Sequence, residues 1–146
     1  MNVWIFQFNP DRFNALSTMY DKEEHHWTVN QYLNHIRKGD ICMIWRAGKP
    51  DVRGIYALGK IVTNPEYIVD PGEESKGWTN AVDRNHRNMR VKYIFIKKLI
   101  DDPILIGAIK NQPELQNLAI IRQPQCSNSP VTPSEWAVLA DMIENR

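Results

Sequence analysis

The sequence lacks several features that would assign it to a specialised class of protein. It has two cysteines, Cys42 and Cys126, with no CxxC and no Cys/His spacing typical of a zinc site. Its apolar runs are far shorter than the roughly 20 residues that a membrane span requires. No charged region followed by an apolar one opens the chain, as a signal peptide would. We therefore expect a cytoplasmic protein with two reduced thiols and no membrane partner.

The chain also lacks an excess of charge of either sign. Eighteen basic residues stand against seventeen acidic ones, which gives a formal net charge of +1. With 146 residues, 24% of them charged and 42% apolar, it has the composition of a soluble globular protein, and we expect one domain over residues 1–146. Any phosphate contact must come from a local basic patch. We thus expect weak non-specific affinity for nucleic acid and a shallow salt dependence.

The motifs of common enzyme classes are missing too. There is no Gly-rich phosphate loop, no GxSxG and no HExxH. His25 and His26 are adjacent, so they cannot share a helix face as an i, i+4 metal pair does. Asp101 and Asp102 precede a proline, which indicates a turn rather than a paired-carboxylate site. We predict no metal, no cofactor and no catalytic residue, although a triad can assemble from residues far apart in sequence.

What the sequence does contain is a set of strand signals mixed with short helices. Strand formers dominate residues 3–8, 41–45, 54–62 and 89–100. The second and third of these segments are expected to pair as a hairpin across a turn at 46–51. Because strands and helices do not alternate strictly, the pattern predicts an α+β domain on a curved or closed sheet.

The helix signals are capping boxes and breakers. A box from Thr132 to Glu135, with Pro133 at the first helical position, predicts a carboxyl-terminal helix. A second box, Thr28 with Gln31, predicts a helix that ends at Gly39. Short helices are also expected at 11–20 and within 111–122, the latter with a strand-like piece, and residues 64–80 are expected to form a long loop.

Five tryptophans are many for this length. Core packing explains Trp4, in an apolar strand, and Trp136, on the apolar face of the last helix. Trp27 precedes the expected helix, Trp45 ends a strand, and Trp78 lies in the polar loop. Tryptophans at such transitions suit the walls of a pocket for a flat ligand, with structural packing as the alternative for each.

The motifs around Trp27 resemble the EVE domain. The matching segments are Trp27-Thr28-Val29-Asn30-Gln31-Tyr32, Lys38-Gly39-Asp40 before an apolar strand, and Gly54-Ile55-Tyr56-Ala57-Leu58-Gly59-Lys60-Ile61-Val62, with Val3-Trp4-Ile5-Phe6 and Val91-Lys92-Tyr93-Ile94 as barrel strands. The resemblance covers most of the chain. That family belongs to the PUA-like superfamily and is related to the YTH readers of methylated adenine in RNA. The resemblance implies a PUA-like curved or closed β-barrel with flanking short helices.

The resemblance also implies a pocket for a modified base, methylated adenine or cytosine, flipped from DNA or RNA. Trp27, Trp45 and Trp78 would form its aromatic cage. Asn9 and Thr28 would read the base edge, although Asn9 precedes a proline and a plain turn role is equally open. Stacking is worth about 1–3 kcal/mol per base and flipping costs a few kcal/mol, so a single indole is not enough.

Basic residues gather in two local groups that could hold phosphates beside the pocket. The candidates are Arg46, Lys49 and Arg53 around the turn, and Arg84, Arg87 and Arg90 before a later strand. A solvated surface without a ligand is the alternative for both groups.

Two other functions stay open. A small hydrolase acting on a modified nucleoside would need a catalytic group in the cavity, with Lys60, Lys92, Glu23, Glu24 and Asp40 as candidates. A protein-interaction module with a nuclease or restriction-type partner is the third reading, because EVE domains often occur with such partners.

Overall fold

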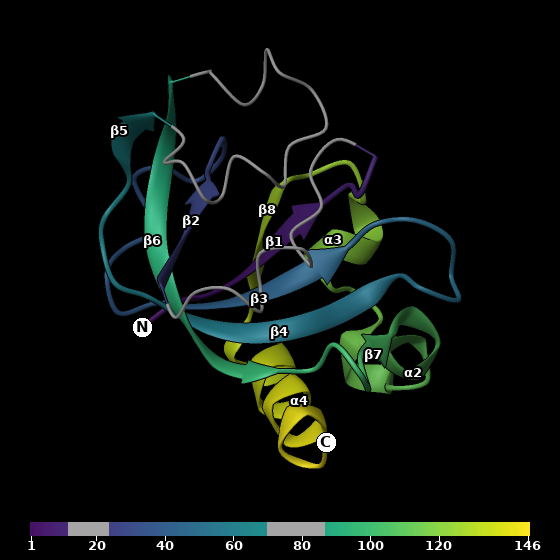
Figure 1. Ribbon diagram of the computed structural model, residues 1–146. Helices are drawn as coiled ribbons and strands as arrows, with labels where there is room; N and C mark the ends of the chain where they lie inside the picture. The colour runs from purple at the N-terminus through teal and green to yellow at the C-terminus, as the bar shows by residue number, and fades with distance from the viewer. Residues whose placement is uncertain (12–23, 70–86) are drawn as a thin grey trace.

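The computed structural model describes residues 1–11, 24–69 and 87–146. Its centre is a mixed, curled eight-stranded sheet in the order β2-β6-β4-β3-β1-β8, with β5 paired to β6 and β7 to β4 (Figure 1). The strands are β1 (Val3–Phe8), β2 (Glu24–Thr28), β3 (Ile41–Arg46), β4 (Gly54–Ile61), β5 (Glu66–Val69), β6 (Arg87–Lys98), β7 (Ile104–Leu105) and β8 (Asn128–Val131). β1 and β3 run parallel, and the other described pairs are antiparallel. The predicted α+β class is confirmed.

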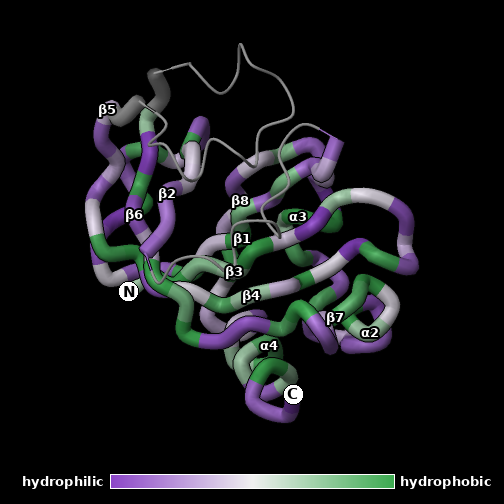
Figure 2. Tube along the Cα trace, viewed as in Figure 1, coloured by the Kyte–Doolittle hydropathy of each residue, from purple (hydrophilic) through white to green (hydrophobic). Residues whose placement is uncertain are grey.

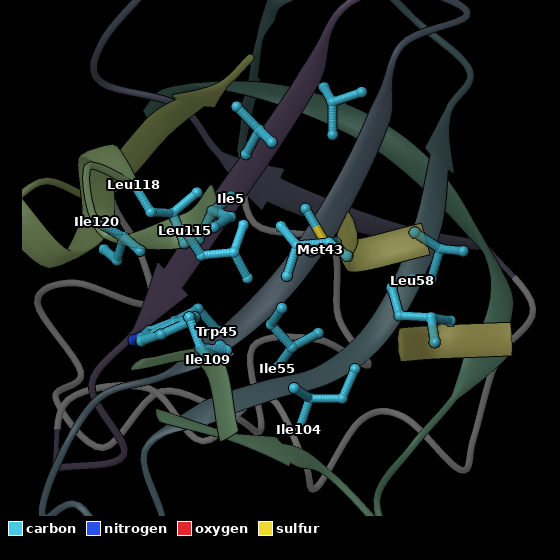
Figure 3. Packing of buried hydrophobic residues seen from close by; sticks show 14 of the residues in the cluster. Ile5, Met43, Trp45, Ile55, Leu58, Ile104, Ile109, Leu115, Leu118 and Ile120 are labelled. Carbon is cyan, nitrogen blue, oxygen red and sulfur yellow. The ribbon is translucent and has the colours of Figure 1, made fainter. Parts of the chain in front are cut away.

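Short helices cover one face of the sheet. They are α2 (Ile106–Lys110), the 3-10 helix η3 (Pro113–Leu115), α3 (Ala119–Arg122) and α4 (Pro133–Glu144). Ile109 of α2 and Leu115 of η3 pack with Ile5 and Met43 of the sheet, as Figure 3 shows. We call this buried cluster the helix-side core. No described helix is both long and apolar enough to span a membrane.

A second cluster, the inner core, fills the concave face of the sheet. Its members are Trp4, Phe6, Phe8, Trp27, Val29, Ile36, Cys42, Ile44, Ala57, Ile61, Val91 and Tyr93. Successive side chains of a strand point to opposite faces, so Ile5 joins the helix-side core and Phe6 the inner core. Both faces of β1 and β3 are buried, and these strands are apolar except for Gln7 and Arg46. The β3–β4 connection is mostly hydrophilic (Figure 2).

The curl of the sheet brings the edge strand β2 close to β1 and β8, at the other end of the sheet. Phe6 of β1 stacks on Trp27 of β2, with ring centroids 6.1 Å apart and planes inclined by 17°. Just beyond β2, the backbone N–H groups of Asn30 and Gln31 donate to Asn128 Oδ1 of β8, at 2.9 and 3.2 Å. Strands at the two ends of the sheet order are therefore neighbours in space.

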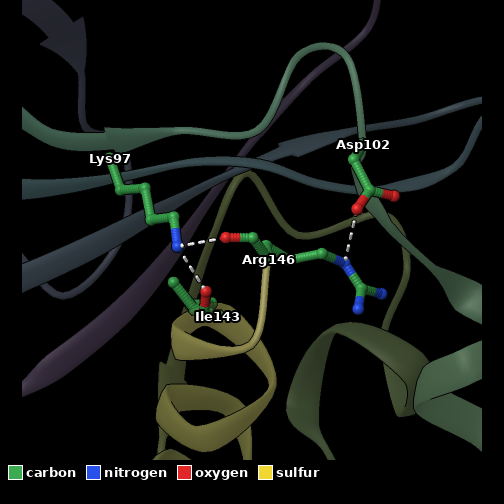
Figure 4. Close-up of polar contacts among 4 residues, drawn as sticks. All are labelled: Lys97, Asp102, Ile143 and Arg146. Atoms are coloured by element: carbon green, nitrogen blue, oxygen red, sulfur yellow. Dashed lines mark hydrogen bonds and ion pairs between the residues drawn. The ribbon is translucent and has the colours of Figure 1, made fainter.

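The helix α4 is held at both ends. The predicted capping box is confirmed, since Glu135 N donates to Thr132 Oγ1 and Thr132 N donates to Glu135 Oε1. At the other end, Lys97 Nζ donates to the carbonyl oxygens of Ile143 and Arg146 at 2.8 and 2.9 Å (Figure 4). Arg146 Nε lies 3.6 Å from Asp102 Oδ2.

The helix predicted after Trp27 is wrong. β2 continues to Thr28, and the two side chains of the supposed capping box bind elsewhere. Thr28 Oγ1 accepts a hydrogen bond from Arg90 Nε at 3.3 Å, and Gln31 Oε1 accepts one from Asn128 N at 3.2 Å. A turn follows instead, and Gly39, at φ +96°, directs the chain into β3.

Other boundaries differ in smaller ways. The hairpin of β3 and β4 is confirmed by their antiparallel pairing. Part of the expected 64–80 loop is strand β5, which pairs with β6. Within 111–122 the structure has η3 and α3, and no strand-like piece. The helix expected at 11–20 lies almost wholly outside the described residues.

Candidate functional site

Trp27 lies in the inner core. Along β2 the buried residues alternate, with His25, Trp27 and Val29 on the concave face. Trp27 is 5% exposed. Besides Phe6, it contacts Phe8 and Tyr93 edge-on, at centroid distances of 6.3 and 6.2 Å. Trp27 is thus a packed aromatic residue, and a ligand could stack on it only if the groups that cover it moved aside.

Phe8 connects Trp27 to two other predicted site residues. Asn9 follows Phe8 directly, and Phe8 is the register partner of Arg46 in β3. The connection is tightened by Ala47 N, which donates to Phe8 O at 2.9 Å. The ring of Phe8 thus contacts Trp27, and the backbones of Asn9 and Arg46, two candidates from separate parts of the chain, adjoin Phe8.

Asn9 is exposed and forms a local turn. Its Oδ1 accepts a hydrogen bond from Asp11 N at 3.0 Å, which is the pattern of an Asx turn. The turn role is therefore present in the structure. It engages only the oxygen of the carboxamide, so a contact between the Asn9 NH₂ group and a ligand stays a prediction.

Trp45 is not near Trp27. It belongs to the helix-side core and is 1% exposed, and Figure 3 shows it beside Ile109. Trp45 shares its face of β3 with Ile41 and Met43, opposite the inner core. Its position favours the packing alternative. Trp78 lies outside the described residues.

Thr28 and Arg90 form a pair on the convex face of the sheet. They are register partners in β2 and β6, next to the inward-facing Trp27 and Val91. Their hydrogen bond engages the Thr28 hydroxyl, and Arg90 is 2% exposed. Thr28 therefore presents its side chain away from Trp27, and Arg90 lies beneath the surface, where direct phosphate contact is not favoured. Arg84 and the side chain of Arg87 lie outside the described residues.

The basic group around the β3–β4 turn is more accessible. Lys49 is exposed, and Arg46 and Arg53 are half-buried. The Arg46 guanidinium lies 5.8 Å from the ring centroid of Tyr56, a cation–π distance that orients it. Because Arg46 pairs with Phe8, this group adjoins Asn9. We call Arg46, Lys49 and Arg53 the basic turn.

Asp40, a candidate acid for the hydrolase alternative, is fully engaged in structure. Its Oδ1 accepts from Asn2 N, and its Oδ2 accepts from Trp4 Nε1 and Arg37 N, all at 2.9 Å. The residue is 4% exposed. It precedes β3 beside the start of β1, roughly 20 Å along the strand from Asn9. Asp40 thus connects the turn at Arg37 and the start of β3 to β1 through hydrogen bonds.

The remaining hydrolase candidates do not gather either. Lys60 is exposed, and Lys92 Nζ lies 3.9 Å from Glu24 Oε1 on the convex face; Glu23 lies outside the described residues. Within the part of the chain that the structure describes, no three His, Cys, Asp or Glu side chains are placed to hold a metal ion.

Asn128 is a residue that the sequence did not single out. It stands at the start of β8, 0% exposed, opposite Phe6. Little in the sequence marks Asn128 as a functional residue, because it follows a Pro/Ser/Asn-rich stretch that predicts only a loop. A polar residue opening the short run Asn128-Ser129-Pro130-Val131 was the one available hint.

Comparison with known proteins places this geometry in a family. The model of the EVE domain matches residues 2–142, and no curated protein matches the chain. A solved structure of a hypothetical protein from Leishmania major is similar with a TM-score of 0.73 and 21% identity, over 99% of this chain and 96% of that one.

Two further structures are similar. Rpa0253 from Rhodopseudomonas palustris has a TM-score of 0.68 and 20% identity, over 99% of this chain and 94% of that one. The human THYN1 protein, solved in complex with DNA containing 5-methylcytosine, has a TM-score of 0.69 and 17% identity, over 100% and 99% of the two chains. The chain belongs to the EVE domain family, and its curled sheet has the PUA-like fold of that family.

Proposed function

We propose that this protein binds a modified nucleobase, of the methylated cytosine or adenine class, flipped out of nucleic acid. The observation that carries the proposal is the grouping of Trp27, Asn9 and Arg46 around Phe8. It supplies an aromatic surface, a polar group for the base edge and a cation for a neighbouring phosphate. A protein of the same fold has been solved with 5-methylcytosine DNA, which supports the proposal.

Stacking on Trp27 alone does not offset the free energy of flipping a base. Stacking gives about 1–3 kcal/mol per base, and flipping costs a few kcal/mol. Phe6 and Phe8 pack against Trp27, so a base that displaces one of these rings still meets the other beside the indole. Trp45 does not contribute to this cage, because it lies in the helix-side core. Trp78 remains the proposed second wall.

Fluorescence anisotropy with short oligonucleotides tests the proposal. Duplexes would carry one 5-methylcytosine, one N6-methyladenine or neither. The native protein is expected to bind one modified duplex about 10-fold or more tightly than the unmodified one. Equal affinity for all three would contradict the proposal.

Paired variants separate binding from folding. Trp27→Phe keeps an aromatic residue in the inner core but reduces the stacking surface, so we expect about a 3–10-fold loss of affinity for the modified duplex. Trp45→Phe makes the same change at an equally buried position in the helix-side core. It should lower the melting temperature similarly and leave the affinity unchanged. Equal losses of affinity would remove Trp27 from the site.

A further inference from the structure

We infer that Asn128 is a specificity-determining residue of the proposed base site and that its NH₂ group donates to an acceptor atom on the base edge. The inference rests on the proposed function. Asn128 lies opposite Phe6 in an antiparallel ladder, and such partners share a face. Since Phe6 stacks on Trp27 in the inner core, Asn128 directs a polar side chain to the aromatic surroundings of Trp27.

The orientation of the Asn128 carboxamide is determined by its neighbours. Oδ1 accepts hydrogen bonds from the backbone N–H groups of Asn30 and Gln31, at 2.9 and 3.2 Å. A flipped carboxamide would set its NH₂ group against these two donors, which is unfavourable. The backbone is also anchored, because Asn128 N donates to Gln31 Oε1. The oxygen therefore joins β8 to the segment after β2, and the NH₂ group lies on the side of the carboxamide away from Asn30 and Gln31.

That NH₂ group is a buried donor without a hydrogen-bond partner among the described residues. The residue is 0% exposed, and Nδ2 makes no hydrogen bond with a described residue. Buried side-chain polar atoms are satisfied in the large majority of native structures, and an exception calls for an explanation such as an absent ligand or water. An acceptor on an entering base would satisfy the group.

The chemistry of the group selects among bases. An amide NH₂ donates two hydrogen bonds and accepts none. The Watson–Crick edge of cytosine presents two adjacent acceptors, N3 and O2, whereas adenine presents N1 beside the donor at N6. Thymine, which carries the same 5-methyl group as 5-methylcytosine, has an N–H donor at position 3. A donor directed at the ring nitrogen is accepted by N3 of 5-methylcytosine and opposed by the N3–H of thymine, although thymine has carbonyl acceptors on either side. Asn128 therefore favours 5-methylcytosine over thymine, and adenine lacks the second acceptor beside N1.

The test is a change of base preference in Asn128→Asp. A carboxylate keeps an oxygen for Asn30 and Gln31 but replaces the donor with a second acceptor. Affinities would be measured by anisotropy for oligonucleotides that differ only in 5-methylcytosine, thymine or cytosine at one position. The ratio of affinities for 5-methylcytosine and thymine is expected to fall about 10–100-fold in the variant. The cost of flipping each base cancels, because both proteins bind the same oligonucleotides.

Ser129→Ala is the matched control. Ser129 is the next residue of β8, is 1% exposed, and has an Oγ that also lacks a hydrogen bond with a described residue. It faces the helix-side core, since its register partner is Ile5. The ratio should stay within about twofold of the native value.

The outcomes separate the two proposals. If the native protein prefers 5-methylcytosine to cytosine and the Asn128→Asp ratio is unchanged, Asn128 only closes the sheet and the inference is overturned while the proposed function stands. If the native protein does not distinguish 5-methylcytosine from cytosine or N6-methyladenine from adenine, both fail.

A measurement on the native protein covers the case in which the variant does not fold. In ¹H–¹⁵N spectra, the side-chain NH₂ signals of Asn128 are expected to shift when the 5-methylcytosine oligonucleotide is added, and to shift less with thymine. A shift of the Trp27 indole signal without any shift at Asn128 would overturn the inference.

Discussion

At the residue scale, Asp40 stabilises the fold by accepting hydrogen bonds, which explains the acidic side chain after Lys38-Gly39. Its two carboxylate oxygens accept three N–H groups, from Asn2, Trp4 and Arg37. In Asp40→Asn the NH₂ group replaces one of the accepting oxygens and meets a donor. Leaving a buried polar group unsatisfied costs about 1–3 kcal/mol, and we expect urea denaturation to show a loss of that size in the free energy of unfolding.

Asp51→Asn is the control for this loss. Asp51 is exposed in the turn between β3 and β4, so its substitution should change the free energy of unfolding by less than about 0.5 kcal/mol. Similar losses in the two variants would show that the hydrogen bonds of Asp40 do not account for its effect.

The two cysteines are expected to differ in reactivity. Cys42 is fully buried in the inner core, and burial raises the pKa of its thiol. A raised pKa keeps the sulfur protonated over a wider range of pH, and the thiolate is the nucleophile. Cys126 is half-buried, 3.7 Å from Gln123 Oε1. A maleimide at pH 8 should therefore label one thiol per native chain and two per unfolded chain.

Cys126→Ser checks the assignment. Mass spectrometry of the labelled native variant should detect no adduct, and labelling should appear only after addition of denaturant. Modification of Cys42 in the native variant at pH 8 would mean that the inner core opens more readily than its burial indicates.

At the scale of elements, α4 is expected to depend on β6 through Lys97. Its ammonium group donates to two carbonyl oxygens, of Ile143 in the last turn of the helix and of Arg146 just after it (Figure 4), where a cation also interacts favourably with the helix dipole. Lys97→Met keeps most of the aliphatic stem but removes both hydrogen bonds. We expect a loss of about 0.5–1.5 kcal/mol in the free energy of unfolding, with faster amide exchange in the last turn of α4.

Lys60→Met is the comparison, because Lys60 is exposed on β4. It should alter the free energy of unfolding by less than about 0.5 kcal/mol and leave exchange in α4 unchanged. If Lys97→Met left exchange in α4 at the native rate, the two hydrogen bonds would not be holding the helix end.

β2 is the element for which local sequence signals conflicted. The spacing of Thr28 and Gln31 satisfies a capping box, yet His25, Trp27 and Val29 also alternate as a half-buried strand would. The strand prevails because Trp27 buries its indole against Phe6 and Phe8, and packing overrides a local cap. The hydrophobic alternation could have predicted β2, but the partners of Thr28 and Gln31, Arg90 and Asn128, lie 62 and 97 residues away.

At the scale of the whole molecule, the net charge of +1 limits how many phosphates can be engaged. If the three side chains of the basic turn each contact one phosphate, the logarithm of the binding constant should fall with the logarithm of salt concentration with a slope of about −2 to −3. The triple variant Arg46→Gln/Lys49→Gln/Arg53→Gln should bring this slope to near zero in anisotropy titrations.

A charge-matched variant distinguishes position from total charge. Lys38→Gln/Lys60→Gln/Lys98→Gln removes three exposed cations, from the turn before β3, from β4 and from β6, away from Phe8 and Asn9. We expect its salt slope to stay within about 0.5 of the native value. A slope reduced as much as in the triple variant would place the phosphate contacts elsewhere.

By itself, the sequence determined the family, the strands β1, β3, β4 and β6, and the capped terminal helix. Those features depend on strand formers, glycines and caps that act over a few neighbouring residues. Only the tertiary structure decided which tryptophans share a face. Ile41-Cys42-Met43-Ile44-Trp45 is apolar at every position because both faces of β3 are covered, so no alternation shows that Trp45 faces the helices. The curl alone sets Asn128 beside the aromatic surroundings of Trp27, since contacts between the two edges of a sheet depend on its closure and leave no local pattern in the chain.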